Sequence, residues 1–385
     1  MSILIKNGRV LDPGSGIDAI KDIYIENGEI REAGNAETII DATGLWVTPG
    51  LIDMHVHLRD PGWPDKETIA SGTAAAAAGG FTTICSMANT DPATDSPEVV
   101  EYILKEKALV HVIPIGSVTK SLQGKELSPF APMKAAGICA ISDDGKSIED
   151  PAIFKAALEQ AAALGLPVLS HAIDENQMNE PEIIARDIAL AKETGVQLHI
   201  CHVSTEAGLT HIKAGGVTTE VCPHHFTLTQ DDAIDTNHKM SPPLRSKKDV
   251  EAMKQGLKDG TITVIATDHA PHHEDDKNLP YDQAANGIIG LETAVPLCIT
   301  ELSFLSPLEL IAKLTINPAK ILNLDKGNLT PGKMADITII DPNHHYTIDK
   351  HSFKSKSRNT PFHGREVRGK VVYTIVEGRV VYDNR

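Results

Sequence analysis

Two histidines separated by one residue form the first chemistry-bearing pattern, in the run Pro49-Gly50-Leu51-Ile52-Asp53-Met54-His55-Val56-His57. On a β-strand, side chains two positions apart point to the same face, so His55 and His57 converge on one point. Two imidazoles in this arrangement suit a divalent ion such as zinc. Taken alone, the pair fits packing or surface histidines equally well, so the interpretation depends on what else the chain brings to the same place.

Four further residues of ligand type end other short apolar runs: Asp144, His171, His202 and Asp268. Four histidines and two carboxylates exceed what one open tetrahedral site requires and suffice for two ions. Asp144 is the predicted bridge, because a carboxylate can divide its two oxygens between two ions. Two ions would lower the pKa of a shared water from about 15.7 toward 7, which would make it the nucleophile. Asp268 is the predicted catalytic residue, a metal ligand that also acts as general base and then acid.

Eight short apolar runs, each about thirty residues from the next, predict the strands that position these residues. They are 50–57, 81–87, 111–117, 137–142, 167–171, 197–203, 217–223 and 262–268. Helix starts follow several of them, since Ser96-Pro97, Asp150-Pro151 and Ser306-Pro307 each place a capping side chain before a proline. The pattern predicts an α/β fold, a (β/α)8 TIM barrel, whose strand carboxyl ends meet at one mouth. An open doubly wound sheet is the alternative, but the chain has no glycine-rich nucleotide loop.

Both ends of the chain have a different pattern, with short β-branched runs and turn sequences. Ile3-Leu4-Ile5 and Ile23-Tyr24-Ile25 occur at one end, and Ile337-Thr338-Ile339-Ile340 and 371–376 at the other. We therefore predict a small β-sandwich domain formed by residues 1–48 and 322–385, and a barrel domain formed by residues 49–321.

Composition limits the possible partners. The 385 residues are 41% hydrophobic, and their net charge of −16 disfavours binding to nucleic acid or anionic membranes. Five cysteines without a C-x-x-C pair indicate reduced thiols rather than disulfides. No apolar run approaches 18 residues. We therefore expect a cytoplasmic protein with a small-molecule substrate.

Several segments together resemble the dihydroorotases of the amidohydrolase superfamily over nearly the whole chain. They are the stretch around His55 and His57, Cys201-His202-Val203-Ser204-Thr205, Pro223-His224-His225, 239–245 (KMSPPLR) and 267–272 (TDHAPH). The resemblance implies two zinc ions. His55, His57 and Asp268 would hold the first, His171 and His202 the second, and Asp144 would lie between them. Relatives often carry a carboxylated lysine at the bridge, and Lys146 lies close to Asp144 in the sequence.

The same resemblance implies the substrate contacts. Arg59, Asn89 and His272 would anchor a substrate carboxylate, which suits a planar guanidinium. Ser241 stands where the family commonly has asparagine, and the backbone of Asn286-Gly287 would contact the substrate ring. The remaining histidines receive simpler interpretations: His111 and His199 pack inside strands, while His224 and His225 support the ligands from outside.

The resulting hypothesis is a zinc-dependent cyclic amidohydrolase that interconverts N-carbamoyl-L-aspartate and L-dihydroorotate in pyrimidine synthesis. One alternative keeps the fold and changes the ring, as in a hydantoinase, dihydropyrimidinase or allantoinase. Another is a non-catalytic scaffold for aspartate transcarbamoylase, which would be expected to have lost metal ligands. We also expect a homodimer, with possible association with aspartate transcarbamoylase.

Overall fold

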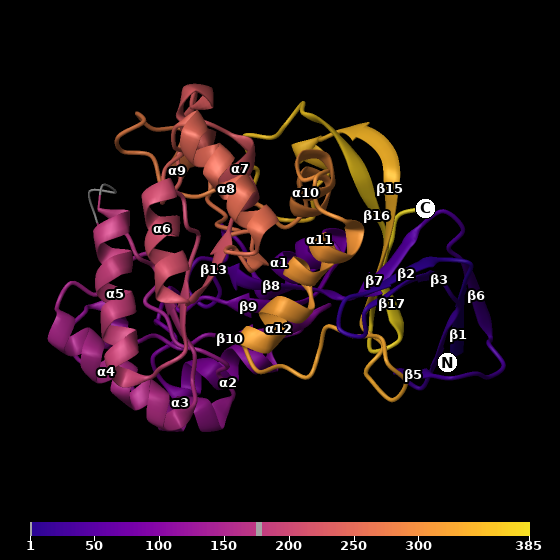
Figure 1. The fold of residues 1–385 in the computed structure, drawn as a ribbon, viewed down its shortest axis with the longest axis horizontal. Coiled ribbons are helices and arrows are strands. Elements are labelled where there is room, and N and C mark those ends of the chain that lie inside the picture. Colours follow the sequence, from indigo (N-terminus) through magenta and orange to yellow (C-terminus); the bar gives the residue numbers. More distant parts are fainter. Residues whose placement is uncertain (1, 175–178) are drawn as a thin grey trace.

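The computed structural model describes residues 2–174 and 179–385. It contains a helix-covered barrel and, beside it, two β-sheets in which both termini lie (Figure 1). Strand and helix therefore alternate in the middle of the chain, while strands dominate its ends. This is the predicted arrangement of a barrel flanked by a terminal sheet domain.

The barrel wall is formed by parallel strands whose order follows the sequence. They are β8 (Leu51–Val56), β9 (Phe81–Ser86), β10 (His111–Pro114), β11 (Val168–Ser170), β12 (Leu198–Ile200), β13 (Thr218–Val221) and β14 (Val264–Ile265). Ile141 bridges to Gly116 on one side and to Val168 on the other, so its segment occupies the fourth position in the wall. A bridge between Val56 and His269 joins the last strand to the first. All eight predicted runs therefore take part, and the TIM barrel is confirmed.

Helices follow the strands around the outside of this wall. They are α1 (Ile69–Ala78), α2 (Pro97–Lys105), α3 (Phe130–Ala136), α4 (Pro151–Leu164), α5 (Glu180–Thr194), α6 (Glu206–Gly215), α7 (Pro223–Thr227), α8 (Lys247–Asp259), α9 (Glu274–Lys277), α10 (Ala294–Glu301), α11 (Pro307–Leu314) and α12 (Ile316–Ile321). Short 3-10 turns are η1 (Lys120–Leu122), η2 (Gln230–Asp232), η3 (Thr236–His238) and η4 (Lys350–Ser352).

Two of the three predicted helix caps are confirmed. The side chain of Asp150 accepts a hydrogen bond from the backbone N–H of Ala152 at 2.8 Å, and that of Ser306 accepts one from Glu309. Helix α2 also begins at its proline, but the Ser96 side chain accepts no capping hydrogen bond, so that part of the prediction is wrong. Proline at the first helical position, with its fixed φ and no N–H to satisfy, is sufficient to start this helix.

The terminal sheets pack against each other around a separate apolar core. One has the order β5-β4-β1-β6 and the other β17-β16-β15-β7-β2-β3. Their strands are β1 (Ser2–Lys6), β2 (Arg9–Asp12), β3 (Ile17–Ile20), β4 (Ile23–Glu26), β5 (Glu29–Arg31), β6 (Thr38–Asp41), β7 (Trp46–Pro49), β15 (Ile337–Thr347), β16 (Glu366–Val376) and β17 (Arg379–Asp383). Ile5, Ile25, Ile337 and Ile375 are completely buried in this core. The strands predicted at both chain ends are thereby confirmed, while the domain boundaries stay a prediction.

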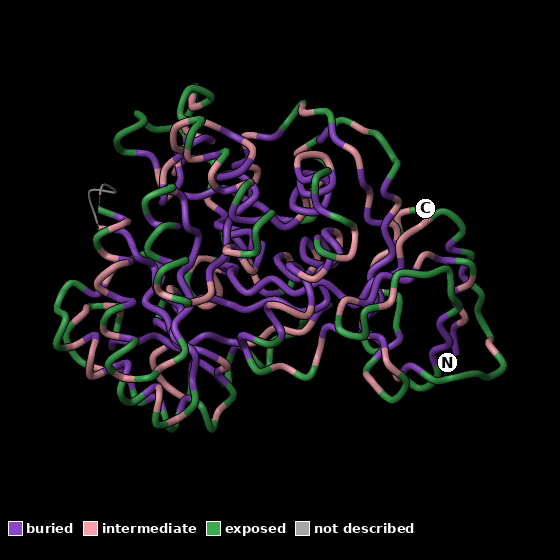
Figure 2. The backbone as a smooth tube through the Cα atoms, in the orientation of Figure 1, coloured by how far each residue is buried: buried purple, intermediate pink, exposed green. Residues whose placement is uncertain are grey.

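The larger sheet also packs against the barrel. Val371 and Val376 of β16 belong to the same buried cluster as residues of α1 and α10, and the Thr374 hydroxyl donates to the Ala77 carbonyl at 2.7 Å. Figure 2 shows continuous burial from the barrel into this sheet. Within the described part of the chain, no helix is long and apolar enough to cross a membrane.

Candidate active site and metal centre

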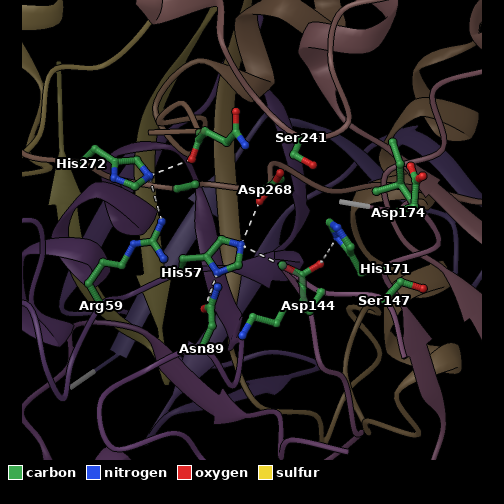
Figure 3. Close-up of a pocket in the computed structure, with 16 residues that line it drawn as sticks. His57, Arg59, Asn89, Asp144, Ser147, His171, Asp174, Ser241, Asp268 and His272 are labelled. Atoms are coloured by element: carbon green, nitrogen blue, oxygen red, sulfur yellow. Dashed lines mark hydrogen bonds and ion pairs between the residues drawn. The ribbon is translucent and has the colours of Figure 1, made fainter. Parts of the chain in front are cut away.

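A cavity of about 380 Å³ opens at the carboxyl ends of the barrel strands, where barrel enzymes place their active sites. Figure 3 shows His57 near its centre, with Asp144 and Asp268 beside it. Except for His55 and His202, which are buried at 0% and 2% exposure, all predicted site residues line the cavity. These lining residues are His57, Arg59, Asn89, Asp144, His171, Ser241, Asp268, His272, Asn286 and Gly287.

His55, His57 and Asp268 form one group of convergent ligand atoms. His57 Nε2 lies 2.9 Å from Asp268 Oδ1, and His55 Nε2 lies 3.5 Å from the same oxygen. Strand β8 points both imidazoles to one side, as the i, i+2 spacing predicts. Asp268 reaches them from the loop after β14, because the bridge between Val56 and His269 brings these strand ends together.

Asp144 lies between two pairs of histidines. Its Oδ2 atom is 3.3 Å from both His55 Nε2 and His57 Nε2, while its Oδ1 atom is 3.1 Å from His171 Nδ1 and 3.3 Å from His202 Nε2. Each oxygen therefore serves a different pair. A carboxylate that bridges two ions needs this division, so the geometry agrees with the role predicted for Asp144. Lys146 lines the same cavity.

Neighbouring carboxylates orient these ligands. Asp143 accepts hydrogen bonds from the backbone N–H groups of Val118 and Thr119, at 2.7 and 3.0 Å, and so fixes the turn from which Asp144 projects. Asp53 accepts bonds from the N–H groups of His55 and Thr267, and so ties β8 to β14. Burial raises the pKa of Asp53 to about 7.

Three site residues have backbone conformations that are uncommon for residues other than glycine. The φ angles of Arg59, His202 and Asp268 are +59°, +31° and +49°. Such angles cost free energy and persist where the surrounding structure enforces them, often at functional sites. All three residues follow barrel strands. There the chain turns to aim Arg59 and Asp268 into the cavity and His202 toward Asp144.

The charge balance of the site fits bound cations. Burial opposes protonation of His55, but Asp144, Glu220 and Asp268 raise its pKa well above the usual value. This excess of buried negative charge favours positive charge at that point. His55 Nε2, which faces both aspartates, is buried without a hydrogen-bond partner. A lone-pair donor aimed at two carboxylates is what a metal site requires, so the residues present fit divalent ions.

Glu220, which was not among the residues predicted from the sequence, bonds to the ring nitrogen of His55 that faces away from the aspartates. Its Oε1 lies 2.6 Å from His55 Nδ1, and its Oε2 lies 3.3 Å from His199 Nε2. Burial raises the pKa of Glu220, but His55 and His199 lower it further, to about 2, so this carboxylate is ionised. Donation from His55 Nδ1 leaves Nε2 free for a metal. In the sequence, the only indication of Glu220 was that it falls within the predicted strand run 217–223.

Asn89 holds the second histidine in the same way. His57 Nδ1 lies 2.7 Å from Asn89 Oδ1. The amide oxygen can only accept, so His57 Nδ1 carries the proton and Nε2 faces the aspartates. The predicted contact of Asn89 with substrate stays a prediction, and orientation of His57 is an additional role that the sequence did not indicate.

Arg59 and His272 form the side of the cavity farther from Asp144. Arg59 Nε donates to the Pro271 carbonyl at 3.1 Å, and its Nη2 lies 3.3 Å from His272 Nε2. Among residues 2–174 and 179–385, no carboxylate forms an ion pair with Arg59 at contact distance. Burial lowers the pKa of Arg59 to about 10, but the side chain remains charged at neutral pH. The cavity thus contains a guanidinium without a carboxylate partner.

Gly287 lies close to this pair and is constrained in conformation. Its φ is +135°, and a Cβ at this position would lie 2.7 Å from Ala270 Cβ. Its N–H donates to the Lys239 carbonyl, and its own carbonyl accepts from Lys277 Nζ and Asn359 Nδ2, each at 3.0 Å. The predicted backbone contact with substrate stays a prediction, while the structure accounts for the glycine by close packing.

The histidines with simpler interpretations are also accounted for. His199 bonds to Thr218 and Glu220 within the barrel, and His111 contacts Asp336. His224 and His225 are buried in α7, and with Cys222 they bring three ligand-type atoms close together. His225 Nε2 bonds to the Pro242 carbonyl at 3.0 Å. The predicted support of the ligands by His224 and His225 stays a prediction.

The model of the amidohydrolase family matches residues 46–381. The chain belongs to the amidohydrolase family. Its convergent histidine and aspartate ligands agree with a metal-dependent member.

Relatives with high sequence similarity to this amidohydrolase are dihydroorotases, one branch of the family. A dihydroorotase of Geobacter metallireducens is 48% identical, with 99% of this chain and 100% of that protein aligned. A dihydroorotase of Acetivibrio thermocellus is 46% identical, with 98% of each chain aligned. The predicted family is therefore confirmed.

Solved structures confirm the architecture. The L-hydantoinase (dihydropyrimidinase) of Arthrobacter aurescens has a TM-score of 0.90 at 27% identity, and covers 99% of this chain and 96% of that one. The dihydropyrimidinase of Brevibacillus agri, at 22% identity and a TM-score of 0.89, supports the fold alone.

Proposed function

We propose that this amidohydrolase is a zinc-dependent dihydroorotase, which interconverts N-carbamoyl-L-aspartate and L-dihydroorotate in pyrimidine synthesis. One observation carries the assignment beyond the family: Arg59 lies on the same cavity as the predicted metal ligands and, within the described residues, has no carboxylate partner. Both substrates carry a carboxylate that can pair with it.

Three side chains form the proposed carboxylate site. The guanidinium of Arg59 can bind a carboxylate through two parallel hydrogen bonds. Asn89, whose oxygen is held by His57, can donate through its NH₂ group. His272 is neutral, because burial and then the charge of Arg59 lower its pKa to about 3. A neutral His272 adds a hydrogen-bonding group without competing with Arg59 for the anion.

The metal ligands would divide into two sets. His55, His57 and Asp268 would hold one zinc ion, and His171 and His202 the other, with Asp144 shared between them. Nitrogen and oxygen donors of these types suit zinc. When bound, such ions polarise a carbonyl and lower the pKa of water.

Asp268 would move the proton. In the hydrolytic direction, its carboxylate accepts a proton from the attacking water and passes it to the ring nitrogen that leaves. In the cyclising direction, it removes a proton from the carbamoyl nitrogen. Burial raises the pKa of Asp268, but His55 and His57 lower it further, so the group is an ionised acceptor. Ser241 and the Asn286-Gly287 backbone, which line the same cavity, would contact the substrate ring.

A hydantoinase or dihydropyrimidinase activity is the main alternative. The likeness to the Arthrobacter aurescens enzyme, at 27% identity, supports it less than the dihydroorotases, at 44–48% identity, support the proposal. Neutral cyclic ureides would leave Arg59 without an anionic partner. A non-catalytic scaffold fits less well, because all six predicted ligands are present. The homodimer, association with aspartate transcarbamoylase and a cytoplasmic location stay predictions.

A substrate panel tests the proposal. The zinc-loaded enzyme is assayed with dihydroorotate, carbamoyl aspartate, hydantoin and dihydrouracil, and its metal content is measured in the same sample. We expect turnover of the first two compounds, about two zinc ions per chain, and much lower kcat/KM for the neutral rings. A fully loaded enzyme that prefers hydantoin or dihydrouracil would refute the assignment.

A further inference from the structure

The proposed carboxylate site depends on backbone segments that follow β14. Pro271 and His272 lie on one side, and Asn286 and Gly287 return on the other. His272 Nε2 is 2.8 Å from the Asn286 carbonyl, which joins the two segments at the cavity. Arg59 depends on the first segment, because its Nε donates to the Pro271 carbonyl.

Asn359 joins the same two segments from behind. Its Nδ2 donates to the carbonyls of Ala270 and Gly287, both at 3.0 Å, and its Oδ1 accepts from the His272 N–H at 3.2 Å. Its own backbone carbonyl accepts from the Ile289 N–H at 2.9 Å. These partners lie 70 to 89 residues away in the sequence (359 − 289 = 70 and 359 − 270 = 89).

The chemistry of Asn359 suits this position. A side-chain amide offers both donors and an acceptor, so one residue satisfies two carbonyls and one N–H. The residue is 4% exposed and does not line the cavity. Asn359 therefore bonds to the backbone of the segments that form the site and does not contact a molecule bound in the cavity.

The segment that carries Asn359 also holds the loop after β8. Ser355 and the backbone of Lys356 bond to Glu67, and the Ser357 hydroxyl donates to the Lys66 carbonyl at 2.7 Å. Lys66 and Glu67 belong to the loop that begins at Arg59. Residues 355–359 therefore connect the loops that position Arg59 and His272, although they follow β15 in the terminal sheet.

We propose that Asn359 is a positioning residue for the carboxylate site, and that the C-terminal segment 355–359 thereby completes the active site of the barrel. The inference rests on the proposed function, because it assigns Arg59 and His272 to the substrate carboxylate. Loss of the amide would allow both segments after β14 to shift. The carboxylate would then bind less tightly in the ground state and the transition state alike.

The test compares Asn359→Ala and Asn359→Asp with Asn317→Ala. The aspartate variant keeps the shape and the acceptor but loses both donors, and it provides a measurement if the alanine variant fails to fold. Asn317 is the matched control, since its Nδ2 also donates to a backbone carbonyl, that of Thr263 at 2.8 Å, before β14 and outside the cavity lining.

We expect both Asn359 variants to raise KM for dihydroorotate by about 10- to 100-fold, which is the scale of one lost hydrogen bond to a charged group. We expect kcat to change by less than about threefold, as for loss of uniform binding. The Asn317 variant should lose some thermal stability, less than Asn359→Ala because it loses one side-chain hydrogen bond instead of three, with KM unchanged. In a His272→Ala background, the effect of Asn359→Ala on KM should be smaller than in the wild type, and the remaining effect acts through Arg59, which donates to the Pro271 carbonyl.

Two results separate the possible failures. Wild-type enzyme without activity on dihydroorotate would refute the proposed function, and with it this inference. Active wild type, together with an unchanged KM in either folded Asn359 variant, would refute the positioning role alone.

Discussion

Replacement of Arg59 by methionine should change stability and substrate binding in opposite directions. Burial lowers the pKa of Arg59 from 12.5 to about 10. At about 1.36 kcal/mol per pKa unit, this lowering corresponds to about 3 kcal/mol, which is the cost of keeping this charge in the cavity. Since Arg59 is only partly buried, this value is an upper bound.

One favourable contact is lost in the same variant, the hydrogen bond from Arg59 Nε to the Pro271 carbonyl, which contributes about 1 kcal/mol. His272 Nε2 donates to the Asn286 carbonyl, so it offers Arg59 no acceptor. The net change for Arg59→Met should therefore be a gain of up to about 2 kcal/mol in the free energy of unfolding. Methionine is also unbranched at Cβ, so the cost of the positive φ is unchanged.

Substrate binding should weaken strongly in this variant. Removal of one partner of a desolvated charge pair costs about 2–5 kcal/mol, so KM for dihydroorotate should rise by about 30-fold or more. Urea unfolding of the zinc-loaded protein and steady-state kinetics measure the two quantities. Arg245→Met is the control, because Arg245 pairs with buried Glu180 at 3.3 Å, and its loss should destabilise the protein by about 2 kcal/mol. An Arg59→Met variant that is clearly less stable, with KM unchanged, would refute the reasoning.

Three further predictions concern the metal centre and the barrel. Asp268→Asn should lower kcat by about 10²–10⁴-fold, and wild-type turnover at full metal content would show that another group moves the proton. Glu220→Gln should weaken zinc binding by about 10- to 100-fold in chelator competition, whereas an unchanged affinity would show that His55 needs no support. Lys313, whose Nζ donates to the Ile262 carbonyl at 2.7 Å, has a pKa lowered to about 8 by burial. Lys313→Met should therefore stabilise the protein by about 1–2 kcal/mol at pH 7. Between pH 8 and 10.5 the unfolded chain binds more protons at Lys313 than the folded one, so wild-type stability should rise toward that of the variant; a variant with the lower Tm at both ends of this range would contradict the argument.

The sequence was sufficient to predict the barrel and the convergence of six ligand-type residues for the same reason. Parallel strands that close into a barrel have their carboxyl ends at one mouth, so the position of a residue at the end of a run already gives its location. The location of Asp144 was predictable, although its strand is reduced to the isolated bridges of Ile141, because the run 137–142 was still apolar. Its bridging role stays a prediction.

The residues that act through another residue could not be predicted. Glu220 contacts His55 across 165 positions of sequence, and Asn359 contacts Ala270 across 89. No fixed spacing relates such partners, since they lie on elements whose approach is decided only when the whole chain has folded. The helix caps are different. Asp150 and Ser306 could be predicted as capping residues because their hydrogen-bond partners lie only two or three residues away.

The site is built from features that each reduce the stability of the protein without its ligands. Arg59 holds a charge without a carboxylate partner among the described residues, Asp144 and Asp268 concentrate negative charge, and three site residues have positive φ angles. Bound cations would offset the charge of the carboxylates, and a substrate carboxylate would offset the charge of Arg59. A ligand that carries a carboxylate should therefore stabilise the folded protein more than a neutral ring does. The surrounding structure must therefore hold the site in place, and the connections from Glu220, Asp143 and Asn359 do so from three separate parts of the chain. Substitution of any one of them should affect the site more than the fold, because Glu220 bonds to His55, Asp143 precedes Asp144, and Asn359 bonds to the backbone of His272.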